Sequence, residues 1–185
     1  MKKIAQVILA TILISTFFLG GSVSRASAGE PKILEFDTMI GVPRPYTGAT
    51  NAIRGIPGGG LPWVVASAEG ELKASGKLEI TVQGLVIDPN DPAAIAAGRA
   101  GTNPSATFKA IVSCLSKDAA GNPTTVNVST DLFPATTGPA SAGGGNAEIE
   151  AMLSLPQPCI APIIFVTGAA SVTNPTGSWF AATGF

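Results

Sequence analysis

Carboxylates are the side chains in this sequence that could carry acid–base chemistry, because the chain contains no histidine. Without an imidazole, the chain cannot form a Ser-His-Asp or Cys-His hydrolase site, or a metal site with histidine ligands. Three pairs of acids are each separated by one residue: Glu35 with Asp37, Glu69 with Glu71, and Glu148 with Glu150. This spacing places both acids on one face of a strand, and glycosidases use two carboxylates. Solvent-facing strands have the same pattern, so we assign no catalytic residue.

A cluster of oxygen-bearing side chains, Asp88, Asn90 and Asp91, has the donor chemistry that Ca²⁺ prefers. The spacing is not that of an EF-hand, and the residues lie beside prolines as turn residues often do. A calcium site and an ordinary turn both remain open here.

The segment from 51 to 63, NAIRGIPGGGLPW, combines one arginine with a run of glycines and an aromatic residue. Its candidate ligand-binding residues are Arg54, Gly58, Gly59, Gly60 and Trp63. A guanidinium and backbone N–H groups could hold an anionic ligand or a sugar. Alternatively, the glycines permit tight bends, Arg54 bonds to neighbouring carbonyls, and Trp63 and Trp179 are core aromatics.

The first 28 residues have the three parts of a secretory signal peptide. Lys2 and Lys3 precede an apolar run over 4–19, and Ala26-Ser27-Ala28 supplies a cleavage site. We expect cleavage there and one mature domain over 29–185, located outside the cell, in the periplasm or at the cell envelope. The alternative is an uncleaved membrane anchor.

Both cysteines lie in the expected mature domain, and export favours a disulfide between Cys114 and Cys159. Closing that loop would stabilise the fold by about 4 kcal/mol on the chain-entropy model. Two buried free thiols are the alternative.

The charge balance of the mature domain disfavours two classes of partner. Without the three basic residues of the leader, eight basic and twelve acidic residues remain, giving a net charge of −4. Such a surface does not attract nucleic acid or anionic membranes, so we expect neither as a partner once the leader is removed.

Apolar residues alternate with polar ones in most segments, which is typical of strands. The clearest prediction is a hairpin of 64–73 and 77–82 around a turn at 74–76. Further strands are predicted over 34–42, 108–114, 126–132, 147–153, 163–172 and 178–183. The pattern predicts an all-β fold of about eight mainly antiparallel strands, either a β-sandwich or a small closed barrel.

Three long loops, 43–62, 88–104 and 134–145, connect these strands, and such loops are the usual place for binding. One short helix is predicted in the second loop, because Asp91 is a suitable N-cap and Pro92 suits the first helical position.

The stretches NAIRGIPGGGLPW (51–63), GTNPSATFKAIVSC (101–114), LPQPCIAPIIFVTG (155–168) and GSWFAATGF (177–185) resemble those of a group of small exported bacterial proteins of unknown function. The resemblance implies a single exported domain and carries over no activity and no site residues.

The missing chemistry favours an exported, non-enzymatic domain with a binding or structural role and no cofactor apart from the possible Ca²⁺. The alternatives are a carboxylate-dependent enzyme acting on polysaccharides and a small outer-membrane β-barrel.

Overall fold

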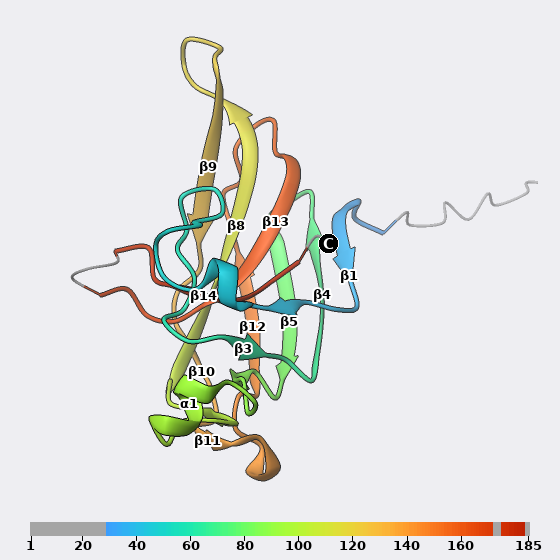
Figure 1. Ribbon diagram of the computed structural model, residues 1–185. Coiled ribbons are helices and arrows are strands. Elements are labelled where there is room, and N and C mark those ends of the chain that lie inside the picture. Colours follow the sequence, from blue (N-terminus) through green and yellow to red (C-terminus); the bar gives the residue numbers. More distant parts are fainter. Residues whose placement is uncertain (1–28, 172–174, 184–185) are drawn as a thin grey trace, which may run out of the picture.

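The computed structural model describes residues 29–171 and 175–183, and most of its regular structure is antiparallel β-strand (Figure 1). The predicted signal peptide over 1–28 and Val172, the last residue of one predicted strand, lie outside this part of the chain. The strands form two main sheets and two small ones rather than a closed barrel. The β-sandwich is therefore the predicted alternative that the structure supports.

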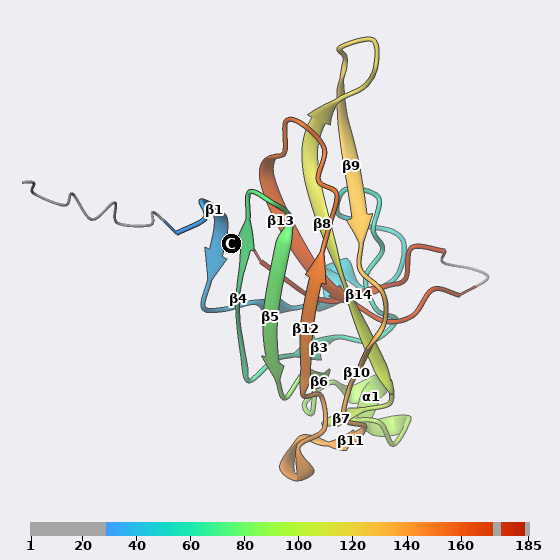
Figure 2. The same ribbon diagram turned by 180° about the vertical axis from the view of Figure 1, so that it is seen from behind.

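Sheet I has four antiparallel strands that lie side by side in Figure 2. In spatial order they are β1 (Lys32–Phe36), β4 (Ser67–Lys73), β5 (Lys77–Gln83) and β12 (Ala147–Met152). The predicted hairpin is confirmed, since β4 and β5 pair with Leu72 opposite Leu78. These two leucines are fully buried, while the neighbouring Glu71 and Glu79 face outward.

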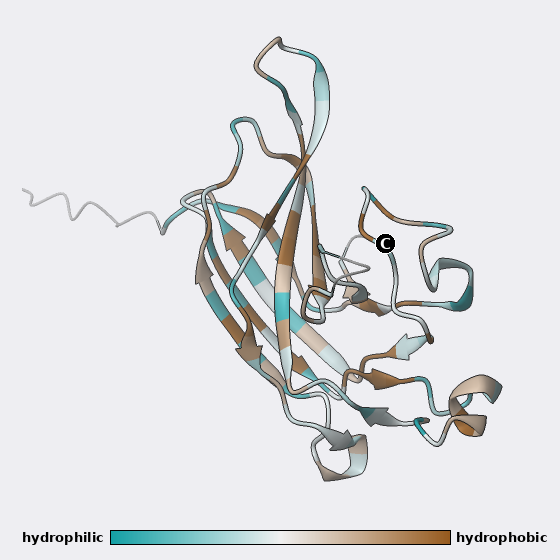
Figure 3. Cartoon of the chain, turned by 90° about the vertical axis from the view of Figure 1, so that its left-hand side faces the viewer, coloured by the Kyte–Doolittle hydropathy of each residue, from teal (hydrophilic) through white to brown (hydrophobic). Residues whose placement is uncertain are grey.

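Sheet II contains the two longest strands of the fold. In spatial order they are β10 (Phe133–Pro134), β8 (Thr107–Lys117), β13 (Ile160–Thr167), β14 (Trp179–Ala182) and β2 (Ile40–Gly41), and β9 (Pro123–Ser129) also pairs with β8. Buried side chains from both sheets form one hydrophobic cluster. The alternation of apolar and polar residues that produces it is visible along the strands in Figure 3.

The remaining elements are short. β3 (Trp63–Val64) pairs with β6 (Val86–Ile87), and β7 (Thr102–Asn103) pairs with β11 (Gly138–Pro139). Two 3₁₀ turns cover Arg44–Tyr46 and Ala140–Ala142. The predicted helix is α1 (Pro92–Ala96), and the Asp91 side chain caps it by accepting a hydrogen bond from Ala94 N.

Two strand predictions are wrong in detail. The expected strand over 34–42 divides into β1 in sheet I and β2 in sheet II, with Met39 buried and Ile40 exposed where the alternation requires the reverse. Similarly, β4 begins at Ser67, and Val64 belongs to the separate strand β3. In both places the chain changes sheet, which a continuous apolar pattern cannot signal.

The loop 43–62 covers the outer face of sheet II. Gly59 N donates to Trp179 O at 2.9 Å, and Trp179 N donates to Pro57 O at 2.9 Å, so the loop is joined to β14 by its backbone. Ile56, a residue of this loop, is fully buried. Because this loop provides a second apolar layer, β8 and β13 are buried on both faces.

The described residues include no helix with the length and apolar character needed to cross a bilayer.

Leu72→Ala is expected to lower the free energy of unfolding by about 2–5 kcal/mol, because it opens a cavity at a fully buried position. The same substitution at Leu132, which is 50% exposed, should change it by less than about 0.5 kcal/mol. Chemical denaturation measures both values. Equal effects would contradict the placement of Leu72 in the core.

Candidate functional site: the acidic face of sheet I

The outer surface of sheet I carries seven carboxylates, here called the acidic face: Glu35, Asp37, Glu69, Glu71, Glu79, Glu148 and Glu150. All three predicted acid pairs lie on it, together with Glu79. The strand pairing brings them together. Their side chains point outward because the residues that alternate with them, such as Leu72 and Ile80, are buried in the core.

A first row of glutamates crosses the whole sheet. Glu35 of β1 is opposite Glu71 of β4, Glu71 is opposite Glu79 of β5, and Glu79 is opposite Glu150 of β12. Like charges directly opposite each other are destabilising, so this row requires counter-charges.

Lysines supply these counter-charges along one side of the first row. The Nζ atom of Lys32 lies 2.7 Å from carboxylate oxygens of both Glu35 and Glu71, and that of Lys73 lies 2.8 Å from Glu71. Lys77 Nζ lies 2.7 Å from Glu79. The hydrogen bonds from Lys32 and Lys73 lower the pKa of Glu71 to about 2. The hydrogen bonds that Lys32 donates to Glu35 and Glu71 raise the pKa of Lys32 itself.

A second row lies on the side away from the lysines. Glu69 and Glu148 are opposite Thr81 from its two neighbouring strands, and Asp37 follows the end of β1. Among the residues that the structure describes, Asp37, Glu69, Glu148 and Glu150 form no ion pair. The uncompensated negative charge of sheet I is therefore concentrated in this row and at Glu150.

The acidic face is hollowed rather than flat, with a groove of about 810 Å³. Gly70 and Ile80 contribute to its lining between the carboxylates. A Cβ atom at Gly70 would collide with the Glu79 carbonyl oxygen and approach the Phe36 ring to 2.8 Å, so glycine is needed for this close approach of neighbouring strands.

A catalytic pair of carboxylates needs one group that stays protonated, as a general acid, near neutral pH. Glu71 is the opposite case, because its lysine partners hold its pKa at about 2. Glu71 is therefore suited to attract a cation rather than to act as a general acid.

The candidate calcium residues are engaged in local contacts. Arg44 Nε donates to Asp91 Oδ2 at 2.7 Å and Arg44 Nη2 to Asp91 Oδ1 at 2.6 Å, while Asp88 Oδ1 accepts from Asn90 N at 2.8 Å. Burial of Asp91 opposes its ionisation, but the bonds from Arg44 and Ala94 outweigh it and lower its pKa. Within 29–171 and 175–183, no group of His, Cys, Asp and Glu side chains is arranged to hold a metal ion. Calcium binding stays a prediction.

The same residues line a second hollow of about 540 Å³, which also includes Trp63, Ile40 and Val64. The structure thus brings Trp63, from the glycine-rich segment 51–63, next to the candidate calcium residues, although the two groups are separate in the sequence. No sequence pattern could predict that these two groups meet, because their contact depends on the pairing of β3 with β6.

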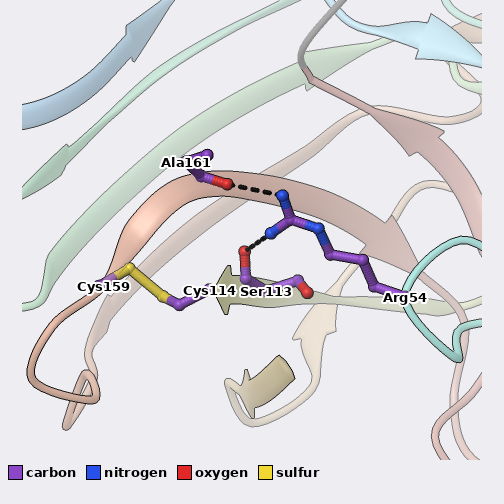
Figure 4. The surroundings of a disulfide bond; sticks show 5 residues. All are labelled: Arg54, Ser113, Cys114, Cys159 and Ala161. Carbon is purple, nitrogen blue, oxygen red and sulfur yellow. Dashed lines mark hydrogen bonds between the residues drawn. A yellow bond between two sulfur atoms is a disulfide. The ribbon is translucent and has the colours of Figure 1, made fainter. Parts of the chain in front are cut away.

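Arg54 lies on the outer face of sheet II and bonds to backbone carbonyls (Figure 4). Its Nη1 atom donates to Ser113 O at 2.6 Å and its Nη2 atom to Ala161 O at 2.8 Å. These carbonyls flank the register shift between β8 and β13, next to the disulfide that joins Cys114 and Cys159 as predicted. The guanidinium therefore links two strands where their ladder is interrupted. Burial lowers its pKa, although arginine remains charged.

Of the other candidate residues of this loop, Gly58, Gly59 and Trp63 have packing roles. A Cβ atom at Gly58 would collide with the Tyr46 carbonyl oxygen, and one at Gly59 would lie 2.9 Å from Trp63 Nε1. Gly60 is exposed and has open space around it. Trp63 is 5% exposed and stacks on Phe180 at 4.0 Å between ring centroids, which confirms that Trp63 is a core aromatic, and Trp179 is 1% exposed.

Lys109 is a buried amine that the sequence pattern places on a wet strand face. It is 9% exposed, and burial lowers its pKa. A Cβ atom at Gly177 would lie 3.5 Å from Lys109 Cε, so the segment before β14 lies against this side chain, a contact that only tertiary structure reveals.

No protein-family model matches the chain, and searches of curated proteins and of solved structures found no similar protein.

Arg54→Ala should lower the free energy of unfolding by about 2–4 kcal/mol, because two charge-assisted hydrogen bonds are lost. Arg54→Gly should cost about 1 kcal/mol less than Arg54→Ala, since φ is +49° at this position and glycine adopts that region without strain. The exposed Arg99→Ala is the control, with a change below about 0.5 kcal/mol. Urea denaturation of the three variants tests the order, and an Arg54→Ala variant as stable as wild type would refute the bridging role.

Glu71→Gln should make the unfolding temperature depend less on pH in the acidic range. The folded pKa of about 2 lies below the ordinary value of 4.5, so this carboxylate stabilises the fold above pH 4.5 and loses that effect as the pH falls towards 2. Thermal unfolding between pH 5 and 2 should therefore show a shallower slope for Glu71→Gln than for wild type. Leu132→Ala, which removes no titratable group, should retain the wild-type slope.

Proposed function

We propose that the mature chain is an exported, non-enzymatic binding domain, and that its acidic face binds a cationic partner. The observation that carries this proposal is the groove of about 810 Å³ lined by seven carboxylates from four strands. Seven of the twelve acidic residues of the chain are gathered there.

Cationic chemistry is favoured because four carboxylates of this face are left without an ion pair in the described part of the chain. Asp37, Glu69 and Glu148 form a row that spans about 14 Å across the sheet, given about 4.8 Å between neighbouring strands. In an extended peptide, side chains on one face repeat about every 6.8 Å, so three alternate lysines or arginines span a similar distance. A basic, extended polypeptide segment is the partner that fits this row.

Location outside the cytoplasm, either secreted, in the periplasm or at the cell envelope, is part of the proposal. The leader-like residues 1–28 and the Cys114–Cys159 disulfide support it, because disulfides persist in oxidising compartments.

A carboxylate-dependent enzyme acting on polysaccharides is the second candidate, favoured by the presence of all three predicted acid pairs in one groove. It would require a carboxyl group in this groove to act as general acid. Release of reducing sugars from glycans by the purified domain, abolished by Glu→Gln substitutions in the groove, would establish it instead of the binding function.

Titration of the oxidised domain with a pentalysine peptide tests the binding proposal. We expect binding that weakens with added salt, and a dissociation constant about three- to tenfold higher for the variant combining Glu69→Gln with Glu148→Gln. The control combines Glu30→Gln with Asp131→Asn, which removes the same charge away from the groove. A separate titration with Ca²⁺ distinguishes a polypeptide ligand from a divalent cation. Equal affinities for the two variants would refute the acidic face as the site.

A further inference from the structure

The strand β9 forms an outer edge of sheet II, and among the described strands it pairs only with β8 (Figures 1 and 2). It runs for seven residues, from Pro123 to Ser129, without a shift in its register.

The hydrogen bonds of the β8–β9 ladder show which backbone groups are free. Thr130 N donates to Ala110 O at 2.9 Å, so residue 130 points its backbone towards β8. In an antiparallel ladder this direction alternates, and the backbone groups of Thr125, Asn127 and Ser129 therefore point away from β8. Across 29–171 and 175–183, the N–H and C=O groups of these three residues have no backbone partner.

Over 125–129, β9 lacks the features that usually prevent an edge from pairing with another strand; the one such feature in β9 is Pro123, at its first position. None of its residues, PTTVNVS, is charged, and Val126 and Val128 are half-buried. The edge strand β1 differs in two ways. Its register is irregular between Lys32 and Leu34, and it carries two charged side chains, Lys32 and Glu35.

The position of β9 is well fixed, as recognition by an edge requires. Its pairing with β8 extends from Ser129 to Pro123, and the Asn127 side-chain amide donates to Arg54 O at 3.0 Å. This bond attaches the strand to the loop 43–62, which itself lies on the outer face of the sheet.

The β9 sequence is complementary to itself when two copies run antiparallel about Asn127. In that register Thr125 faces Ser129 of the partner, Val126 faces Val128, and Asn127 faces Asn127. Apolar residues meet on one face of the sheet and polar residues on the other, as strand alternation requires. In this register no like charges oppose each other across the two strands. The mature chain carries a net charge of −4, but most of its acids lie on sheet I and therefore away from this edge.

We propose that β9 is an interface for a second copy of this chain, which extends sheet II across a twofold axis at Asn127. The inference does not depend on the ligand of the acidic face, since the two surfaces belong to different sheets.

Two double variants that differ at one residue test both the interface and its register. Thr125→Asp with Ser129→Asp places like charges opposite each other at both symmetry-related pairs, and should weaken dimerisation about tenfold. Thr125→Lys with Ser129→Asp places opposite charges at the same pairs, and should dimerise at least as tightly as wild type. Residues 125 and 129 are solvent-exposed, so both variants should fold with the disulfide formed.

Sedimentation velocity of the oxidised domain from 10 µM to 1 mM, at low and physiological salt, measures the association. Amide hydrogen exchange provides an internal control, because Thr125, Asn127 and Ser129 should become protected with increasing concentration while Val126 and Val128, already bonded to β8, should not change. A wild-type protein that stays monomeric at 1 mM overturns the proposal. So does a dimer that both double variants form equally well.

Discussion

The pairing of Leu72 with Leu78 in the β4–β5 hairpin determines both the core and the outer surface of sheet I. With these leucines buried, strand alternation directs Glu71 and Glu79 to the solvent, side by side. A slip of one residue would turn the acids inward and the leucines outward, so the cost of burying charge holds the register. The turn adds to this, because Gly76 has φ of +93° and its carbonyl accepts from Leu153 N, beyond the end of β12.

Sheet II differs from sheet I because much of β8 and β13 is buried on both faces. The inner face packs within the shared cluster, and the loop 43–62 closes the outer face. The glycines of this loop permit the close approach of its backbone to Tyr46 and Trp63, and Arg54 bonds across the irregularity beside the disulfide. What looks in the sequence like a binding loop is in large part the second layer over a sheet.

Local patterns predicted local structure well. The hairpin, the cap of α1 by Asp91 and the strand β12 follow from side-chain alternation and helix-start chemistry. The disulfide followed from the compartment expected for an exported chain. In contrast, the division of 34–42 between two sheets and the burial of Lys109 depend on contacts between distant segments.

At the candidate site too, the sequence predicts local features but not contacts between distant segments. Each acid pair is visible in the sequence, yet Glu79 and Glu150 become neighbours only through strand order, which places β12 beside β5 although more than sixty residues separate these strands in the chain. Alternation gives the face of each carboxylate, and topology gives its neighbours across the sheet.

The lysines on one side of the acidic face give it a direction. Along β4, Lys73, Glu71 and Glu69 succeed one another at intervals of two residues, so the cation and the unpaired acid lie about 14 Å apart. The Debye length at physiological ionic strength is about 8 Å, so the lysine does not cancel the field at Glu69. The groove is thus an electric dipole laid along the strands, and an approaching molecule with unequal charge at its two ends would be turned into one orientation before it made contact.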